Sequence, residues 1–248
     1  DPEKAAKIIG TTGQLQMYDF EPNLVAPTVQ GNQQPAPLPS LYGLLSGLQK
    51  QADKGTPQGY FLFKTVKKKV TEKVKGKKVT KTKTWHQLVQ GDPPWGAPNR
   101  KELLLPYKNG KQPRNTVVLK LPANREAVWC KGALNCPGAG QNGKSSSDKY
   151  WYLFKYFPAT THPDGPPELR GQDLVESGIS SDVDPNTGQN IVTLQFTGHG
   201  SKQFKKITEA EYNRGRVNAG QAGQLNASDP ATISTYAGAY PDGFGGPV

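Results

Sequence analysis

One histidine of this sequence occupies a position from which it could exchange protons. His199 stands between Gly198 and Gly200, and Ser201 follows. Imidazole titrates near neutral pH, so such a residue could serve as the general base of a hydrolase. A histidine between two glycines, where a strand passes into a helix, is more often a turn residue, and Ser201 is a common type of helix N-cap. We therefore expect no catalytic role for His199.

A second polar cluster resembles the beginning of a calcium-binding loop. Asp182, Asp184, Asn186 and Gly188 follow the D-x-D-x-N-x-G spacing of an EF-hand. The bidentate acid of that loop would fall at the position of Thr193, which has no carboxylate to offer. A hairpin turn over the same residues explains the pattern more simply, so we expect no metal there.

Other signs of catalysis or of metal binding are missing. The chain has no G-x-S-x-G elbow and no H-E-x-x-H, and we expect no P-loop. Its three His are too scattered to complete a zinc site with Cys130 and Cys136. We therefore expect a protein that is not an enzyme and uses neither cofactor nor metal. The two Cys are either unrelated thiols or one local disulfide, which would suit an oxidising compartment.

The positive charge is concentrated in one segment. Ten Lys and one Glu lie between Lys64 and Lys83, which supply +9 of the net charge of +11. Abundant Thr and Val, with Gly76 in the middle, predict a hairpin over residues 60–85. The basic patch comprises Lys67, Lys68, Lys69, Lys73, Lys77, Lys78 and Lys81.

Three interpretations of this patch stay open. The simplest is that Lys on exposed strands prevents edge-to-edge pairing of sheets. The others are attraction to an anionic membrane surface and binding of nucleic-acid phosphates. Aromatic rings for base stacking do not alternate with these Lys, which argues against nucleic acid.

The remaining elements are short and separated by loops, because the chain has 28 Gly and 22 Pro. We expect a helix over residues 1–9, a strand near 15–20 and a Pro-rich linker over 25–40. Leu at helical spacing predicts a helix from 41 to about 55. Strands at 116–121, 150–157 and 191–196, a loop over 131–148 and a helix at 201–214 follow. Beyond Gly215 we expect little structure.

Apolar side chains on two of these segments could contact an unfolded polypeptide. An alternating strand has two faces, and a free face could take up extended peptide. Burial in a core is the simpler explanation for most of these residues. The candidate substrate-binding residues are Leu44, Leu48, Tyr60, Phe61, Phe63, Tyr152 and Phe154.

Several segments together resemble the first extracytoplasmic domain of the SecD family, an accessory subunit of the Sec protein-export machinery. The family pattern has a G-x-D-L stretch, a D-x-x-T-G turn, a V-x-x-x-F strand and G-x-x-x-F at a helix start. These occur here as Gly171–Leu174, Asp184–Gly188, Val192–Phe196 and Gly200–Phe204. The opening "DPEKAAKIIGTTGQLQMYDF" and the strand Tyr152–Phe154 are also similar, although Gly13 stands where the family usually has Ala.

The resemblance implies an α+β fold, with a partial ferredoxin-like base and a large β-rich inserted head. The base would consist of residues 1–25 and 190–248, the head of residues 26–189. The chain would be a piece of a longer cell-membrane protein and lie on the extracytoplasmic side. Its partners would be SecF, the SecYEG translocon and unfolded preprotein, which it would help to pull outward with the proton gradient. The segment of about 64–148 has no counterpart in this pattern.

The alternative from the residues alone is a basic extracytoplasmic module that binds anionic lipid or nucleic acid through Lys64–Lys83.

Overall fold

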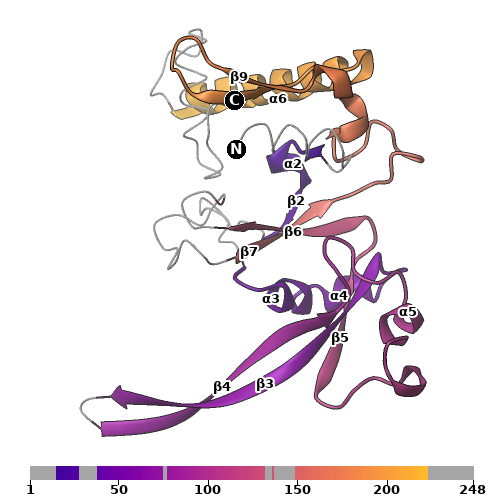
Figure 1. Cartoon of the computed structure of the whole chain (residues 1–248), viewed down its shortest axis with the longest axis vertical. Coiled ribbons are helices and arrows are strands. Elements are labelled where there is room, and N and C mark those ends of the chain that lie inside the picture. The colour runs from indigo at the N-terminus through magenta and orange to yellow at the C-terminus, as the bar shows by residue number, and fades with distance from the viewer. Residues whose placement is uncertain (1–14, 28–37, 75–76, 132–135, 137–148, 223–248) are drawn as a thin grey trace. The chain divides into compact units, whose positions relative to one another are not determined.

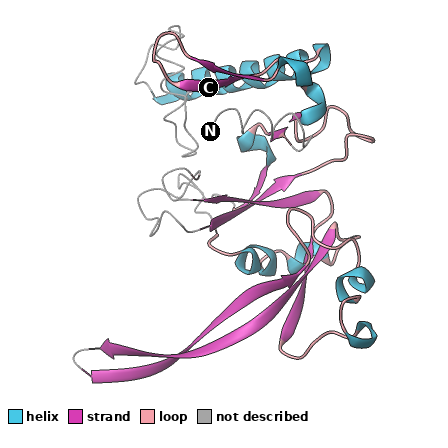
Figure 2. Cartoon of the chain, viewed as in Figure 1, coloured by secondary structure: helices cyan, strands magenta, loops and turns pink. Residues whose placement is uncertain are grey.

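A computed structural model describes residues 15–27, 38–74, 77–131, 136 and 149–222 (Figure 1). These residues divide into two compact units: unit 1 contains 15–23 and 156–222, and unit 2 contains 24–27 and 38–155. Each unit combines helices with small antiparallel sheets, which confirms the expected mixture of α and β structure (Figure 2). The helix predicted over 1–9 and the end of the chain beyond 222 lie outside the described residues.

The longest element of unit 2 is the predicted hairpin, formed by β3 (Gly59–Val74) and β4 (Lys77–Gln90). Its strands are antiparallel and keep one register from Phe63↔Leu88 to Val74↔Lys77, after a shift between Leu62 and Phe63. β5 (Thr116–Leu121), which the sequence also predicted, pairs with β3 on its other side as far as Lys64↔Thr116. Beyond Lys64 the two strands continue as a ribbon that has no third strand among the described residues (Figure 1).

The second sheet of unit 2 has the order β2–β7–β6. Its middle strand, β7 (Lys149–Lys155), is the aromatic strand expected at 150–157. β6 (Arg125–Lys131) pairs with the whole length of β7, and the sequence analysis did not predict it. β2 (Leu24–Ala26) begins just before the segment that was expected to be a linker. The expected loop over 131–148 falls almost entirely outside the described residues.

The main hydrophobic core of unit 2 forms because successive residues of a strand point to opposite faces. Phe61 and Phe63 of β3 point to the face that packs on α3 (Leu41–Ser46) and on Leu153 of β7. Leu62 points to the other face. There it is buried with Leu103 and Leu104 of α5 (Arg100–Leu104), a short helix followed by the 3-10 turn η1 (Lys108–Gly110).

The helix predicted from 41 to about 55 is two helices, α3 and α4 (Gln49–Ala52). The Gln49 amide fills the break between them, since its Nε2 donates to the Leu45 carbonyl at 2.8 Å. The same amide donates to the Lys120 carbonyl at 2.9 Å and accepts from the Lys120 N–H at 3.0 Å. One side chain therefore fixes α4 to the outer edge of β5.

The first described elements of unit 1 are β1 (Gln16–Met17) and the short helix α2 (Phe20–Asn23). β1 pairs with β8 (Leu169–Arg170). Two 3-10 turns, η3 (Gly171–Asp173) and η4 (Glu176–Gly178), lead to the hairpin of β9 (Ser180–Val183) and β10 (Asn190–Thr193). The predicted turn over 184–188 is confirmed. Gly188 has a φ of +69° and donates its N–H to the Asp184 carbonyl at 2.8 Å.

The last helix, α6 (Gly198–Ala222), is longer than the predicted 201–214 at both ends. Ser201 is not its N-cap. That position belongs to Thr197, whose Oγ1 accepts the Gly200 N–H at 3.1 Å and whose carbonyl accepts the Ser201 N–H at 2.9 Å. The reason is that the strand before the helix ends early, at Thr193.

Buried polar groups hold unit 1 together. Arg170 is buried, and its guanidinium donates to the carbonyls of Phe157 (2.6 Å) and Pro163 (3.2 Å), so it fixes the loop before β8. Arg214 of α6 pairs with the buried Asp19 at 2.6 Å. Residues 156–189 belong to unit 1, whereas we expected them in the head, with the boundary at 189.

Gly200 offers a test of how closely α6 approaches η3. A Cβ on Gly200 would lie 2.4 Å from the Asp173 carbonyl oxygen, whereas one on Gly198 would meet nothing within 4 Å. We expect Gly200→Ala to lower the free energy of unfolding by about 1–3 kcal/mol, because the backbone must shift. Gly198→Ala, the matched control, should change it by less than about 0.5 kcal/mol. Urea unfolding of both variants checks this, and equal effects would contradict it.

Candidate functional site

The structure places the candidate substrate-binding residues in the interior of unit 2. Leu44, Phe61 and Phe63 belong to the buried core between the sheets. Tyr152 and Phe154 of β7 are also buried, while Leu48 and Tyr60 are half-buried against hydrophobic clusters. The structure therefore assigns these residues to the core, which corrects the expectation that a free face presents them to a substrate. Over residues 60–63 both faces of β3 are covered, by α3 on one side and α5 on the other.

One of the exposed large apolar side chains of unit 2 is Trp129, which is 46% exposed. Its ring, with Val128 and Ala127 of β6, lines a hollow of about 210 Å³ whose other wall is Pro93 and Pro94. We call this the Trp129 hollow. The Lys149 Nζ lies 3.9 Å from the centroid of the Trp129 ring, so a cation covers part of it.

Among the described residues, the backbone beside the hollow belongs to the edge strand β6. The Ala127 N–H donates to the Pro94 carbonyl at 2.9 Å, so the polar groups of Ala127 point away from β7. Those of Trp129, two residues on, point the same way. They make no hydrogen bond outside the sheet within the described part of the chain. Unpaired N–H and C=O groups next to an apolar hollow are features that an added peptide strand can use.

The two Cys form a disulfide at the end of β6. Cys130 is the residue after Trp129, and its sulfur is bonded to that of Cys136, which is buried. Of the two alternatives that the sequence left open, the structure contains the local disulfide.

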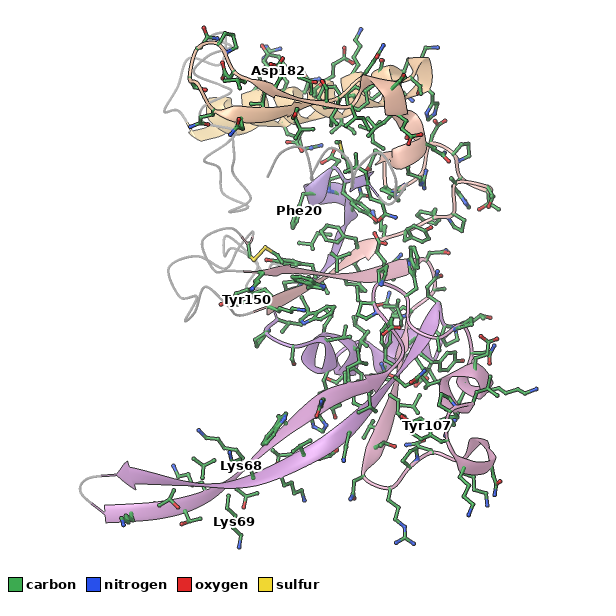
Figure 3. The ribbon with its side chains drawn as sticks, viewed as in Figure 1. Phe20, Lys68, Lys69, Tyr107, Tyr150 and Asp182 are labelled. Carbon is green, nitrogen blue, oxygen red and sulfur yellow. A yellow bond between two sulfur atoms is a disulfide. The ribbon has the colours of Figure 1, made fainter. Side chains whose placement is uncertain are left out.

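The basic patch lies on the ribbon. Side chains of Lys67, Lys68, Lys69, Lys78 and Lys81 are exposed, and Lys68 and Lys69 point to opposite sides (Figure 3). Lys73 and Lys77 take part in the backbone register as Lys73↔Lys78 and Val74↔Lys77, but their side chains lie outside the described residues. Among the described residues, the five exposed Lys make no ion pair.

His199 is more than a turn residue, because its side chain contacts two carboxylates. It lies in the first turn of α6, where Nδ1 is 2.8 Å from Asp173 Oδ1 and Nε2 is 3.1 Å from Asp164 Oδ1. Gln203, one turn on, also donates to Asp164. Asp173 is buried, accepts the Arg170 N–H at 2.7 Å, and accepts the Thr197 N–H at 2.8 Å through its carbonyl. The imidazole therefore links α6 to the 164–173 segment.

This arrangement does not prepare His199 to act as a base. Both ring nitrogens already face a carboxylate, which favours the doubly protonated imidazolium as a structural link. Its hydrogen bond with Asp173, and then that with Asp164, raise the pKa of His199 above the ordinary value of 6.5. The hydrogen bond between His199 and Asp164 also lowers the pKa of Asp164.

The residues that resemble a calcium-binding loop form the hairpin turn between β9 and β10. Asp184 accepts the Asn186 N–H at 2.8 Å and the Thr187 hydroxyl at 2.9 Å, and these bonds, the first above all, lower the pKa of Asp184. Asp182 lies in β9 beside it (Figure 3). Within the described ranges, no group of three His, Cys, Asp or Glu is arranged to hold a metal ion.

One sequence pattern was overlooked. Residues 138–145, GAGQNGKS, match the P-loop spacing G-x-x-x-x-G-K-[ST] and lie outside the described residues. A P-loop requires a helix that starts at its Lys. β7 begins at Lys149, four residues after Ser145. We assign no nucleotide site to this match.

Comparisons add no relative from which a function could be transferred. No family model, no curated protein and no solved structure matches the chain. No helix in the described part is both long and apolar enough to cross a membrane.

The His199 link predicts a pH-dependent contribution to the stability of unit 1. Because its pKa is raised in the folded state, the stabilisation is complete below the unfolded value of 6.5 and is lost as pH rises through the folded pKa. We expect His199→Gln to lower the melting temperature at about pH 6 and less at about pH 9. The effect should not exceed about 2 °C, since the side chain is 45% exposed and solvent screens the pair.

Thermal unfolding followed by circular dichroism at both pH values measures this difference. Lys202→Gln, which removes a charge from an exposed position of the same helix, serves as the control and should show no such dependence. A loss of equal size at both pH values for His199→Gln would contradict the imidazolium link.

Proposed function

We propose that the chain is a non-catalytic extracytoplasmic module of a SecD-like subunit, which holds preprotein emerging from the SecYEG translocon. Together with SecF and the proton gradient used by the membrane part, it would help to pull the preprotein outward. In this proposal unit 1 is the partial ferredoxin-like base, and unit 2 is the head inserted in the sequence between its two halves.

The observation that carries the proposal is the meeting of the SecD-like segments in unit 1. Gly200, which opens the G-x-x-x-F segment, packs against the backbone of Asp173 in the G-x-D-L segment. Gln16, from the SecD-like opening of the chain, pairs with Arg170, the residue before that segment. These segments are far apart in the sequence, and their contacts would follow if they formed one base.

The Trp129 hollow is the part of unit 2 best suited to an extended polypeptide. An incoming strand could pair with the backbone groups of Trp129, which have no partner outside the sheet among the described residues, and its alternate side chains could enter the hollow. A hollow of about 210 Å³ lined mainly by apolar groups accepts one or two apolar side chains and sets little requirement on their order. Such tolerance suits a substrate class with varied sequences.

Replacing Trp129 tests this assignment. We expect Trp129→Ala to weaken the binding of a labelled, unfolded secretory polypeptide about tenfold or more, because interface Trp side chains commonly contribute 2 kcal/mol or more. Fluorescence anisotropy with the whole chain measures the affinity.

The control is Leu105→Ala, since Leu105 is 65% exposed, apolar and in the same unit but lines no hollow. It should leave the affinity within about twofold, which is a difference of about 0.4 kcal/mol. Equal losses in both variants would indicate non-specific hydrophobic binding and would contradict the assignment to the Trp129 hollow. Absence of binding by the unchanged chain would overturn the proposal.

A further inference from the structure

We propose that one face of the β3–β4 ribbon docks on an anionic lipid bilayer. This inference rests on the register of the ribbon and on its charges, and it does not depend on the proposed role in protein export. Its basis is that the ribbon is not uniformly basic, because the register sorts its side chains into two chemically different faces.

Cross-strand pairs of an antiparallel ribbon share a face, and successive pairs alternate between faces. Val66↔Trp85, Lys68↔Lys83 and Val70↔Lys81 therefore lie on one face, which we call the lipid face. Val79 lies on it as well, in the pair Glu72↔Val79. The opposite face, which we call the water face, carries the pairs Lys67↔Thr84, Lys69↔Thr82, Thr71↔Thr80 and Lys73↔Lys78.

The lipid face combines positive charge with exposed apolar groups. Trp85 is 43% and Val79 is 37% exposed, although both are large apolar residues. Lys68 and Lys81 are exposed beside them and make no ion pair with a described residue. Trp is the side chain most typical of the membrane–water interface, and Lys can bury its methylene chain while its ammonium group contacts lipid phosphates.

The exposed ammonium groups of Lys68 and Lys81 add an electrostatic argument, because an anionic surface beside them attracts both charges. Lipid headgroups provide such a surface, and the apolar side chains between the Lys can enter the boundary below the headgroups.

The water face has the composition of a surface that stays solvated. Its Thr hydroxyls form a polar ladder, in which the Thr71 and Thr80 oxygens are 3.1 Å apart. No large apolar residue occurs among its pairs Lys67↔Thr84, Lys69↔Thr82, Thr71↔Thr80 and Lys73↔Lys78.

Nucleic acid is a weaker match for the same ribbon. Single-stranded nucleic acids are held by stacked aromatic rings, and among these described pairs Trp85 supplies the only one. His86 next to it already stacks on Tyr42, with ring centroids 3.5 Å apart. Val66, Val70 and Val79 have no role in binding phosphates, whereas a bilayer uses both the charged and the apolar groups.

Two charge-matched double variants distinguish the faces. Lys68→Gln with Lys81→Gln neutralises the lipid face, and Lys67→Gln with Lys69→Gln removes the same charge from the water face. Cosedimentation of the whole chain with vesicles of phosphatidylglycerol and phosphatidylcholine measures the binding. We expect the lipid-face variant to bind about 30-fold more weakly, since each Lys close to an anionic surface contributes about fivefold. The water-face variant should lose less than about fivefold.

Trp85 reports on docking without any change of charge. Addition of the anionic vesicles should shift its emission to shorter wavelength, and brominated lipids should quench it, in the unchanged chain but not in Trp85→Phe. Vesicles of phosphatidylcholine alone should have neither effect. Equal losses in the two double variants, absence of vesicle binding, or equally tight binding of duplex DNA would each overturn the proposal.

Discussion

The difference in length between β3 and its neighbour β5 decides how unit 2 is built. Where β5 accompanies β3, up to Lys64, the sheet has enough width to bury Phe61 and Phe63 on one face and Leu62 on the other. Beyond that point two strands alone remain, and a two-stranded ribbon cannot exclude water from either face. The change from aromatic residues to Lys and Thr along β3 follows this boundary. Core and ribbon are thus two parts of the same strand, which differ in how many neighbours they have.

Unit 1 relies on a different kind of interaction. Its described buried residues include Asp19, Arg170 and Asp173, and each has a charged or backbone partner. Such groups are stable in an interior only when they are paired, so the partners must meet in a defined geometry. This requirement brings the early segment, the 156–173 segment and α6 together although little apolar surface is available. It also explains why His199, between two carboxylates, is a link in that network.

The sequence predicted those elements that depend on patterns within a short segment. Alternation and turn residues predicted the hairpin, β5, β7 and the 184–188 turn, since period and turn chemistry are properties of short segments. β6 was missed because it follows a Pro-rich connection and its alternation is short. The candidate substrate residues were misplaced, because a sequence shows that a strand has an apolar face but not whether a helix such as α5 covers it.

Long-range partners could not be predicted for the same reason. The contacts of His199 with Asp164 and Asp173 join residues 35 and 26 positions apart, and no periodicity encodes them. The Trp129 hollow likewise needs Pro93 and Pro94 from a distant connection. Its one signal in the sequence was an aromatic residue beside a Cys, which was assigned no role.

The Gln49 amide has a consequence for the chain in crowded solution. By bonding both backbone groups of Lys120, it occupies the outer margin of β5 with a side chain of the same molecule. A second molecule cannot extend the sheet at that residue, and along the opposite margin the ribbon's ammonium groups repel an identical copy. Edge-to-edge pairing through this sheet is therefore hindered at Lys120 on one side and along the basic ribbon on the other.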